Sequence, residues 1–231
     1  MLYICSDIHA EYDLFIKLLK KIGFSKNDRM IICGDIIDKG KDSVKLAKLI
    51  FSMPNVECIM GNHEYAFLKL YRAKLADSPK DFDKLLEELK AYFTEDGDLL
   101  DWETVDKLDS LPLYIEEEDF ICVHSGLPLD ENGKILPLEK ATAEQLVYDR
   151  RFKNADVYHT DKKCVFFGHT QTDCVYEKPI ILGYLHDSEK KPTKISDFYK
   201  IHLDTGTWSN GIASCFCVNS LKAFYVKRDF K

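Results

Sequence analysis

Short apolar runs that end in small polar clusters recur five times along this chain. Each run is rich in Ile, Val, Cys or Phe, and Ser, Gly or His follows it. Runs of this length bounded by polar residues are typical of central strands that are buried on both faces of a sheet. The predicted strands cover residues 2–5, 30–33, 56–60, 120–123 and 164–167. Because the carboxyl ends of strands in an α/β sheet border its ligand crevice, we expect the functional site where these polar clusters gather.

Apolar residues at helical spacing fill the gaps between the predicted strands. One stripe covers residues 14–22 and ends at Gly23, and a second covers residues 44–50 after Ser43, the predicted N-cap. Residues 64–110 are rich in charge but keep apolar side chains at helical spacing. This stretch interrupts the alternation of strands and polar clusters, so it predicts an inserted helical cap over one edge of the site.

The last third of the chain contains one charged excursion and further apolar segments. Residues 176–200 include a run of charges and a proline, which predicts a long loop or a hairpin. Further strands, mostly antiparallel, are predicted at 199–203, 215–218 and 223–226. The pattern as a whole predicts the α/β class and one domain over residues 1–231, with the cap at 64–110 embedded in it.

Composition narrows the class of protein. The chain has 231 residues and a net charge of −7. Its residues are 45% hydrophobic and 31% charged, and this composition excludes disorder as a description of the whole chain. The acidic balance argues against a nucleic-acid-binding protein. No apolar run approaches the roughly 18 residues of a membrane span, and the start of the chain is too short for a signal-peptide core. Most cysteines lie in apolar runs without a C-x-x-C motif, so we expect reduced thiols and a cytoplasmic location.

Six polar side chains at the ends of the predicted strands have the chemistry of divalent-metal ligands. They are Asp7, His9, Asp35, Asn62, His124 and His169. Asp7 and His9 lie two residues apart, so strand alternation predicts that both point to one face. Carboxylate and amide oxygens with imidazole nitrogens suit Mn²⁺, Fe or Zn²⁺. Six ligands are more than one ion needs, which favours two ions about 3.5–4 Å apart that share one carboxylate.

Each of these residues has a simpler explanation when it is considered alone. A lone histidine such as His124 is commonly a hydrogen-bonded core residue, and Asp7 or Asp35 alone could start a turn or cap a helix. The combination favours metal, because strand ends inside a protein gather such groups only around a charge to neutralise. Residues 34–43 do not form a phosphate-binding P-loop, because their glycines are one residue too far apart. The chain also lacks the G-x-S-x-G motif of serine hydrolases.

The ordered set of polar clusters resembles the metallophosphoesterase superfamily, and within it the phosphoprotein phosphatase branch. The family motifs G-D-x-H-G, G-D-x-x-D-R-G, G-N-H-E, H-A/G-G and G-H correspond to residues 6–10, 34–40, 61–64, 124–126 and 168–169. This resemblance implies a four-layer α/β/β/α sandwich of mixed sheets. In size the chain is similar to small bacterial and phage protein phosphatases and to symmetrical diadenosine tetraphosphatases.

The resemblance also implies the roles of the site residues. One ion is held by Asp7, His9 and Asp35, and the other by Asp35, Asn62, His124 and His169. A water shared by the two ions forms hydroxide near neutral pH and attacks phosphorus in line. His63 is then the general acid that protonates the leaving oxygen, and Asp38 orients its ring and favours its protonated form.

The basic residues that contact phosphate in the family are only partly present. Lys39 stands where the family has an arginine, which replaces a bidentate guanidinium by a single ammonium group. Met60 occupies the position of another frequent arginine. Residues 148–150 resemble a segment that supplies a phosphate clamp, so Arg150 is the predicted clamp, with Arg151 as the alternative. Lys39 and Arg150, together with the Asn62 amide, form the predicted phosphate-binding set.

Three functions remain open at this point. The leading prediction is a dinuclear phosphoserine and phosphothreonine protein phosphatase that acts on phosphorylated proteins, peptides or small phosphoesters. The second is a symmetrical dinucleoside tetraphosphate hydrolase, for which aromatic and basic residues of the cap such as Tyr71, Arg72 and Trp102 could supply base contacts. The third is a catalytically silent scaffold, which the complete ligand set and His63 disfavour. The sequence contains no indication of oligomeric state.

Overall fold

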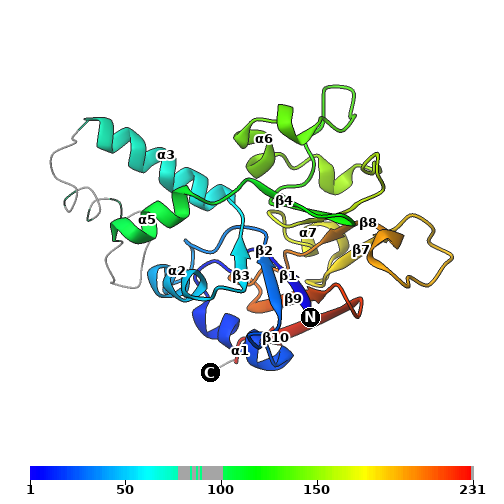
Figure 1. Ribbon diagram of the computed structural model, residues 1–231, viewed down its shortest axis with the longest axis horizontal. Helices are drawn as coiled ribbons and strands as arrows, with labels where there is room; N and C mark the ends of the chain where they lie inside the picture. Colours follow the sequence, from blue (N-terminus) through cyan, green and yellow to red (C-terminus); the bar gives the residue numbers. More distant parts are fainter. Residues whose placement is uncertain (78–83, 85–86, 88, 90–100, 230–231) are drawn as a thin grey trace.

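Two five-stranded sheets form the centre of the molecule (Figure 1). This computed structural model describes residues 1–77, 84, 87, 89 and 101–229. The first sheet has the order β10 (Lys222–Lys227), β9 (Ile212–Cys217), β1 (Leu2–Cys5), β2 (Arg29–Ile32) and β3 (Val56–Cys58). Strands β1, β2 and β3 are parallel, whereas β9 runs antiparallel to both of its neighbours. The parallel strands therefore bring their carboxyl ends to one edge.

The second sheet repeats this arrangement. Its order is β4 (Tyr114–Glu116), β5 (Phe120–Val123), β6 (Cys164–Phe167), β8 (Phe198–His202) and β7 (Leu182–Leu185). Strands β5, β6 and β8 are parallel, and the edge strands β4 and β7 are antiparallel to their neighbours. The prediction of mostly antiparallel C-terminal strands is correct for β9 and β10 but wrong for the β6–β8 pair. Strand β8 follows a long excursion, which leaves room for a parallel return.

Helices cover the outer faces of the two sheets. The α-helices are α1 (Tyr12–Ile22), α2 (Ser43–Ser52), α3 (Asn62–Asp77), α5 (Trp102–Asp109), α6 (Ala143–Tyr148) and α7 (Asp173–Tyr176). The chain also has three short 3₁₀ helices among the described residues: η1 (Leu138–Lys140), η2 (Phe152–Asn154) and η3 (Ile195–Asp197). Helix α1 ends at Gly23 in the left-handed conformation, as its sequence predicts. Helix α2 begins at Ser43, so its N-cap position is Asp42 and not Ser43, and the Ser43 hydroxyl accepts a hydrogen bond from Asp38 N at 3.1 Å.

Three apolar layers separate the four structural layers. Ile4, Ile31 and Phe166 lie between the two sheets, while their chain neighbours Cys5 and Ile32 face helices α1 and α2. On the far side, a third layer packs the second sheet against α6 and η2. Because successive side chains of a strand point to opposite faces, strands covered on both faces must be apolar throughout. This layering confirms the predicted α/β/β/α sandwich of mixed sheets.

The predicted cap and the excursion are only partly described. Helix α5 and all of α3 after its first two residues fall within residues 64–110 and extend to the left in Figure 1, and Leu89 is buried. Leu85, Tyr92, Phe93 and Leu100 also belong to the predicted cap, but they lie outside the described residues. In the excursion 176–200, β7 pairs antiparallel with β8 across the connection 186–197, which includes η3. One domain with an inserted cap stays a prediction.

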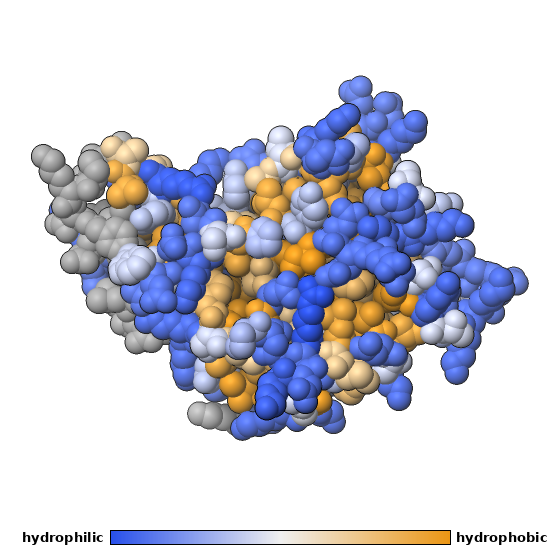
Figure 2. All heavy atoms as spheres, viewed as in Figure 1, coloured by the Kyte–Doolittle hydropathy of each residue, from blue (hydrophilic) through white to orange (hydrophobic). Residues whose placement is uncertain are grey.

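Figure 2 shows the face of the molecule that is turned toward the viewer in Figure 1. Hydrophilic side chains lie around the outer part of this face, and apolar side chains lie toward its middle. No helix among the described residues combines the length and the apolar character that crossing a bilayer requires.

Candidate metal centre

The loops that follow five strands bring all six predicted ligands to one place. Asp7 and His9 follow β1, Asp35 follows β2, Asn62 begins α3, His124 follows β5 and His169 follows β6. The most distant pair in the sequence is in direct contact, because His169 N donates to Asp7 Oδ2 at 3.0 Å. The site therefore spans the carboxyl ends of both sheets, where the polar clusters predict it.

The backbone of these loops differs from what strand alternation predicts. Four of the six residues have left-handed φ angles: 52° at Asp7, 49° at His9, 57° at Asp35 and 66° at His169. This conformation is unfavourable for residues with a Cβ atom, at about 1–3 kcal/mol each in a constrained site. Asp7 and His9 thus converge through a tight turn beyond the end of β1. Alternation along a strand was the wrong reason for their proximity.

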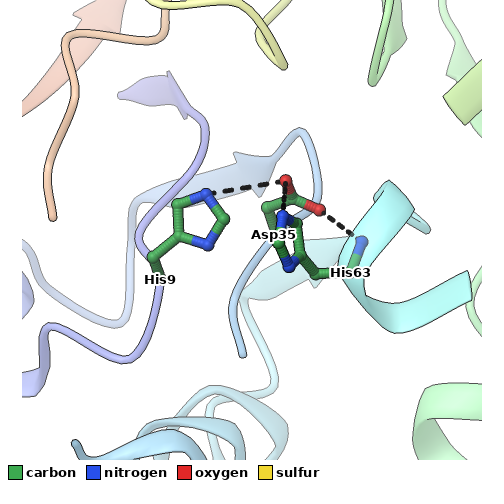
Figure 3. Close-up of side chains that lie close together, drawn as sticks. All are labelled: His9, Asp35 and His63. Atoms are coloured by element: carbon green, nitrogen blue, oxygen red, sulfur yellow. Dashed lines mark hydrogen bonds and ion pairs between the residues drawn. The ribbon is translucent and has the colours of Figure 1, made fainter. Parts of the chain in front are cut away.

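The Asp35 carboxylate is the centre of the site. Its Oδ2 lies 3.4 Å from His124 Nε2 and 3.6 Å from His9 Nε2. Two groups of potential metal ligands share this one residue, the first made of His9, Asp35 and His63 and the second of Asp35, His124 and His169. Figure 3 shows His9, from the loop after β1, and His63, from the first turn of α3, pointing toward the carboxylate of Asp35. A carboxylate between two groups of nitrogen ligands has the form of a bridging ligand.

Asn62 and His169 complete the second group. Asn62 Oδ1 lies 2.7 Å from His169 Nδ1 and 3.0 Å from His124 Nε2. The other ring nitrogen of His169, Nε2, is buried and has no hydrogen-bond partner among the described residues. His124 Nδ1 donates to Cys33 O at 2.7 Å, which leaves its Nε2 directed at Asp35. The donor set of buried imidazoles, carboxylates and one amide fits a divalent cation.

The protonation states follow from burial and from the Asp35 charge. Burial lowers the pKa of both His9 and His169 to about 3, so both rings are neutral and keep a lone pair for a cation. Burial opposes protonation of His124 as well, but the Asp35 carboxylate outweighs it and raises the pKa to about 10. Burial raises the pKa of Asp7 to about 6. One buried imidazolium thus partly compensates the carboxylates at a site whose chemistry favours cations.

His63 and Asp38 form the predicted pair. His63 Nδ1 donates to Asp38 Oδ2 at 2.5 Å, and His63 Nε2 lies 3.8 Å from Asp35 Oδ2. Burial lowers the pKa of His63, but the bond to Asp38 and the Asp35 charge outweigh it, so the net shift is upward. The ring lies between two carboxylates, so its geometry is compatible with a proton donor and also with a metal ligand. Its role as general acid stays a prediction.

The predicted phosphate-binding residues differ in how they lie. Lys39 Nζ is 3.0 Å from His9 Nε2, so it occupies the neighbourhood of the ring nitrogen that a cation would need. Arg150 is exposed, and its Nη1 donates to Thr170 Oγ1 at 2.8 Å and to His169 O at 3.2 Å. Arg151 instead pairs with Asp149 and donates to the carbonyls of residues 129 and 130. Of the two arginines, only Arg150 is held beside the metal centre.

Glu64 is a site residue whose role the sequence analysis missed. Its side chain is fully buried, and its two oxygens accept hydrogen bonds from four backbone amides, those of Asp35, Ile36, Ile37 and Gly61, at 2.8–3.1 Å. It therefore ties the loop after β2 to the loop after β3. The sequence did contain an indication of this role, because Glu64 is the last residue of the G-N-H-E motif. A carboxylate at the start of a helix has backbone N–H donors within reach.

Comparisons with known proteins agree with this geometry. Residues 1–191 match the family model described as calcineurin-like phosphoesterase. A symmetrical bis(5'-nucleosyl)-tetraphosphatase of Wigglesworthia glossinidia brevipalpis is 36% identical over 129 residues, which are 54% of this chain and 44% of that protein. This chain therefore spans less than half the length of the symmetrical relatives that it matches. An asymmetrical bis(5'-nucleosyl)-tetraphosphatase of Bacillus velezensis is 26% identical over 88% of this chain and 83% of its own length.

Solved structures share the fold. A protein proposed to be a diadenosine tetraphosphatase superimposes with a TM-score of 0.67 at 19% identity, over 98% of this chain and 92% of its own. A metallophosphoesterase from Sphaerobacter thermophilus has a TM-score of 0.54 at 17% identity, over 100% and 89%. With most of the chain matched by one family model and the metal-ligand loops in place, this chain belongs to the calcineurin-like phosphoesterase family.

Proposed function

We propose that this protein is a metal-dependent phosphoesterase that hydrolyses dinucleoside polyphosphates. The observation that carries the proposal is the shared position of Asp35, which belongs to both groups of buried ligands. A carboxylate between two ligand groups suits enzymes that hold a pair of divalent ions around one reacting phosphorus. A scaffold without activity has no use for this arrangement.

The ions fit the side chains that surround them. Asp7, His9 and Asp35 would hold the first ion, and Asp35, Asn62, His124 and His169 the second. Asp7 belongs to this set because its Oδ1 lies 3.9 Å from His9 Nε2. When bound, the two ions supply a nucleophile from water at neutral pH and neutralise charge on the phosphoryl oxygens. We propose Mn²⁺ as the first candidate, with Fe and Zn²⁺ as alternatives.

The remaining side chains bind the substrate and move a proton. His63 carries a proton on Nε2 while Asp38 accepts the Nδ1 proton, so the ring is oriented to protonate the leaving oxygen. Arg150 is anchored on the His169 loop and offers the rest of its guanidinium to a phosphate. Lys39 supplies a second positive charge after it moves away from His9. Asn62 contacts the same phosphate from the start of α3.

We take the substrate class, dinucleoside polyphosphates, from the names of the relatives and not from the leading sequence-based prediction of a protein phosphatase. The relative that matches 54% of this chain and the relative that matches 88% of it are both named bis(5'-nucleosyl)-tetraphosphatases. Phosphoprotein phosphatase activity stays a prediction. We also propose a cytoplasmic location, because all eight cysteines are free and seven of them are buried.

A substrate panel on one Mn²⁺-loaded sample tests the proposal. We expect kcat/KM for diadenosine tetraphosphate to exceed that for a phosphoserine peptide at least about tenfold, with p-nitrophenyl phosphate as a general substrate and Asp35→Asn as the control for contaminating phosphatases. A higher kcat/KM for the peptide would replace the proposal by the protein phosphatase. If no substrate is hydrolysed while metal is bound, the scaffold explanation holds.

A further inference from the structure

Tyr148 lies at the rim of the metal centre, and none of the steps above uses it. It is the last residue of α6, and 42% of its surface is exposed. Its ring centroid is 6.4 Å from that of His169, with the rings nearly perpendicular. Its hydroxyl donates to Asn62 O at 3.5 Å. An exposed aromatic ring thus stands beside two of the predicted metal ligands.

A second tyrosine supports this ring from the neighbouring helix. Tyr65 on α3 is half-buried, and its ring centroid lies 6.1 Å from that of Tyr148 at an interplanar angle of 81°. Lys69 on α3 also pairs with Glu144 on α6 at 3.1 Å, so the two helices are tied together next to the pair. The position of Tyr148 is therefore set by α3, the helix that begins at Asn62. Its described ring neighbours, Tyr65 and His169, both meet it edge-on, so none of the described residues stacks on its face.

The chemistry around Tyr148 selects the kind of group that it can contact. Arg150 and Lys39 supply positive charge for phosphate, whereas Tyr148 and Tyr65 supply apolar rings directly beside it. A group that is anionic at one end and flat and aromatic at the other matches this surface. Nucleotides have this form, and every nucleobase has a π-face that stacks on aromatic side chains.

We propose that Tyr148, held in place by Tyr65, stacks on the nucleobase of the nucleotide whose phosphate binds the metal centre. This proposal rests on the proposed function, since it assigns the base contact of the same substrate. Tyr148 would then be a specificity residue that acts through binding, and it would discriminate nucleotides from phosphate compounds without a base.

Calorimetric titration of the Mn²⁺-loaded protein with adenosine 5'-monophosphate and with ribose 5-phosphate tests the stacking contact through affinity, and phosphate release is measured in parallel so that only binding heat is compared. The two compounds differ at C1' alone, where the nucleotide has adenine and the sugar phosphate has a hydroxyl group. We expect the nucleotide to bind about tenfold more tightly than the sugar phosphate, as one stacked base contributes in other systems. Tyr148→Ala should abolish that difference, whereas Tyr148→Trp should retain it.

Tyr158→Ala is the matched control. Tyr158 is 55% exposed and contacts the His186 ring at 5.2 Å, so it resembles Tyr148 in setting but lies at the opposite end of the second sheet. This variant should keep the tenfold preference for the nucleotide.

Equal binding of the two compounds to the wild type would overturn the proposal, as would an unchanged preference in Tyr148→Ala. An equal loss of affinity for both compounds in Tyr148→Ala would also overturn the proposal. It would show that Tyr148 supports the metal ligands. Hydrolysis of diadenosine tetraphosphate, measured separately, decides the proposed function.

Discussion

At the scale of single residues, two buried carboxylates organise the site in different ways. Asp35 faces imidazole nitrogens, whereas Glu64 faces backbone amides. A buried carboxylate is costly unless hydrogen bonds or charges compensate it, and each of these has its own compensation. The motif letters predicted Asp35 as a ligand. They did not predict Glu64 as the support of the Asp35 loop, because a pattern of residues does not show which backbone donors a side chain meets.

Glu64→Gln should destabilise the protein and weaken metal binding. The amide nitrogen of Gln is a donor, so it would face backbone donors that now share the Glu64 oxygens. We expect a loss of about 1–3 kcal/mol in the free energy of unfolding, measured by urea denaturation. Glu103→Gln, at an exposed side chain of α5, is the matched control and should change the free energy of unfolding by less than about 0.5 kcal/mol. Equal stability of the two variants would contradict the supporting role of Glu64.

His63→Asn should distinguish a proton donor from a metal ligand. An alkyl phosphate has a poor leaving group that needs a proton, so its kcat should fall about 10²–10⁴-fold. p-Nitrophenyl phosphate has a good leaving group and should lose much less. Steady-state rates on both substrates, with metal content measured in parallel, check this. A parallel loss of metal and of both rates would show that His63 is a ligand.

At the scale of elements, the sequence predicted the strands well and the loops that follow them poorly. Apolar runs locate β1, β2, β5 and β6, because strands covered on both faces must be apolar. The loops are different, since left-handed residues such as Asp7 and His169 are held by contacts between distant segments. No local pattern of polar residues indicates that conformation. The parallel pairing of β8 with β6 likewise depends on the whole sheet.

Gly168→Ala should weaken the metal centre through the loop after β6. A Cβ atom at this position would collide with the Asp7 carboxylate and with the Ser6 hydroxyl. We expect metal affinity to fall about 10- to 100-fold, as for other changes beside metal ligands, measured by titration with Mn²⁺. Gly133→Ala is the control: its φ of 78° strains an alanine, but the Cβ it would add meets no atom within 4 Å beyond its own chain neighbours, so metal affinity should stay unchanged. Unchanged affinity in Gly168→Ala would show that the close approach of this loop is dispensable.

At the scale of the whole molecule, the site exists because two sheets present their carboxyl ends together. Asp7, Asp35 and Asn62 come from loops of the first sheet, and His124 and His169 from loops of the second. The apolar layer around Ile4, Ile31 and Phe166 fixes the two sheets against each other and so fixes the distance between these loops. The motif order predicted this convergence. The pairing of Tyr65 with Tyr148 could not be predicted, because it depends on how α3 meets α6.

The most direct test counts the metal ions bound by one chain. The protein is loaded with Mn²⁺, dialysed, and analysed for metal and protein content, alongside Asp35→Asn. We predict two ions per chain in the wild type and loss of the pair in the variant, since Asp35 belongs to both ligand groups. One ion or none in the wild type, or an unchanged count in Asp35→Asn, would contradict the account.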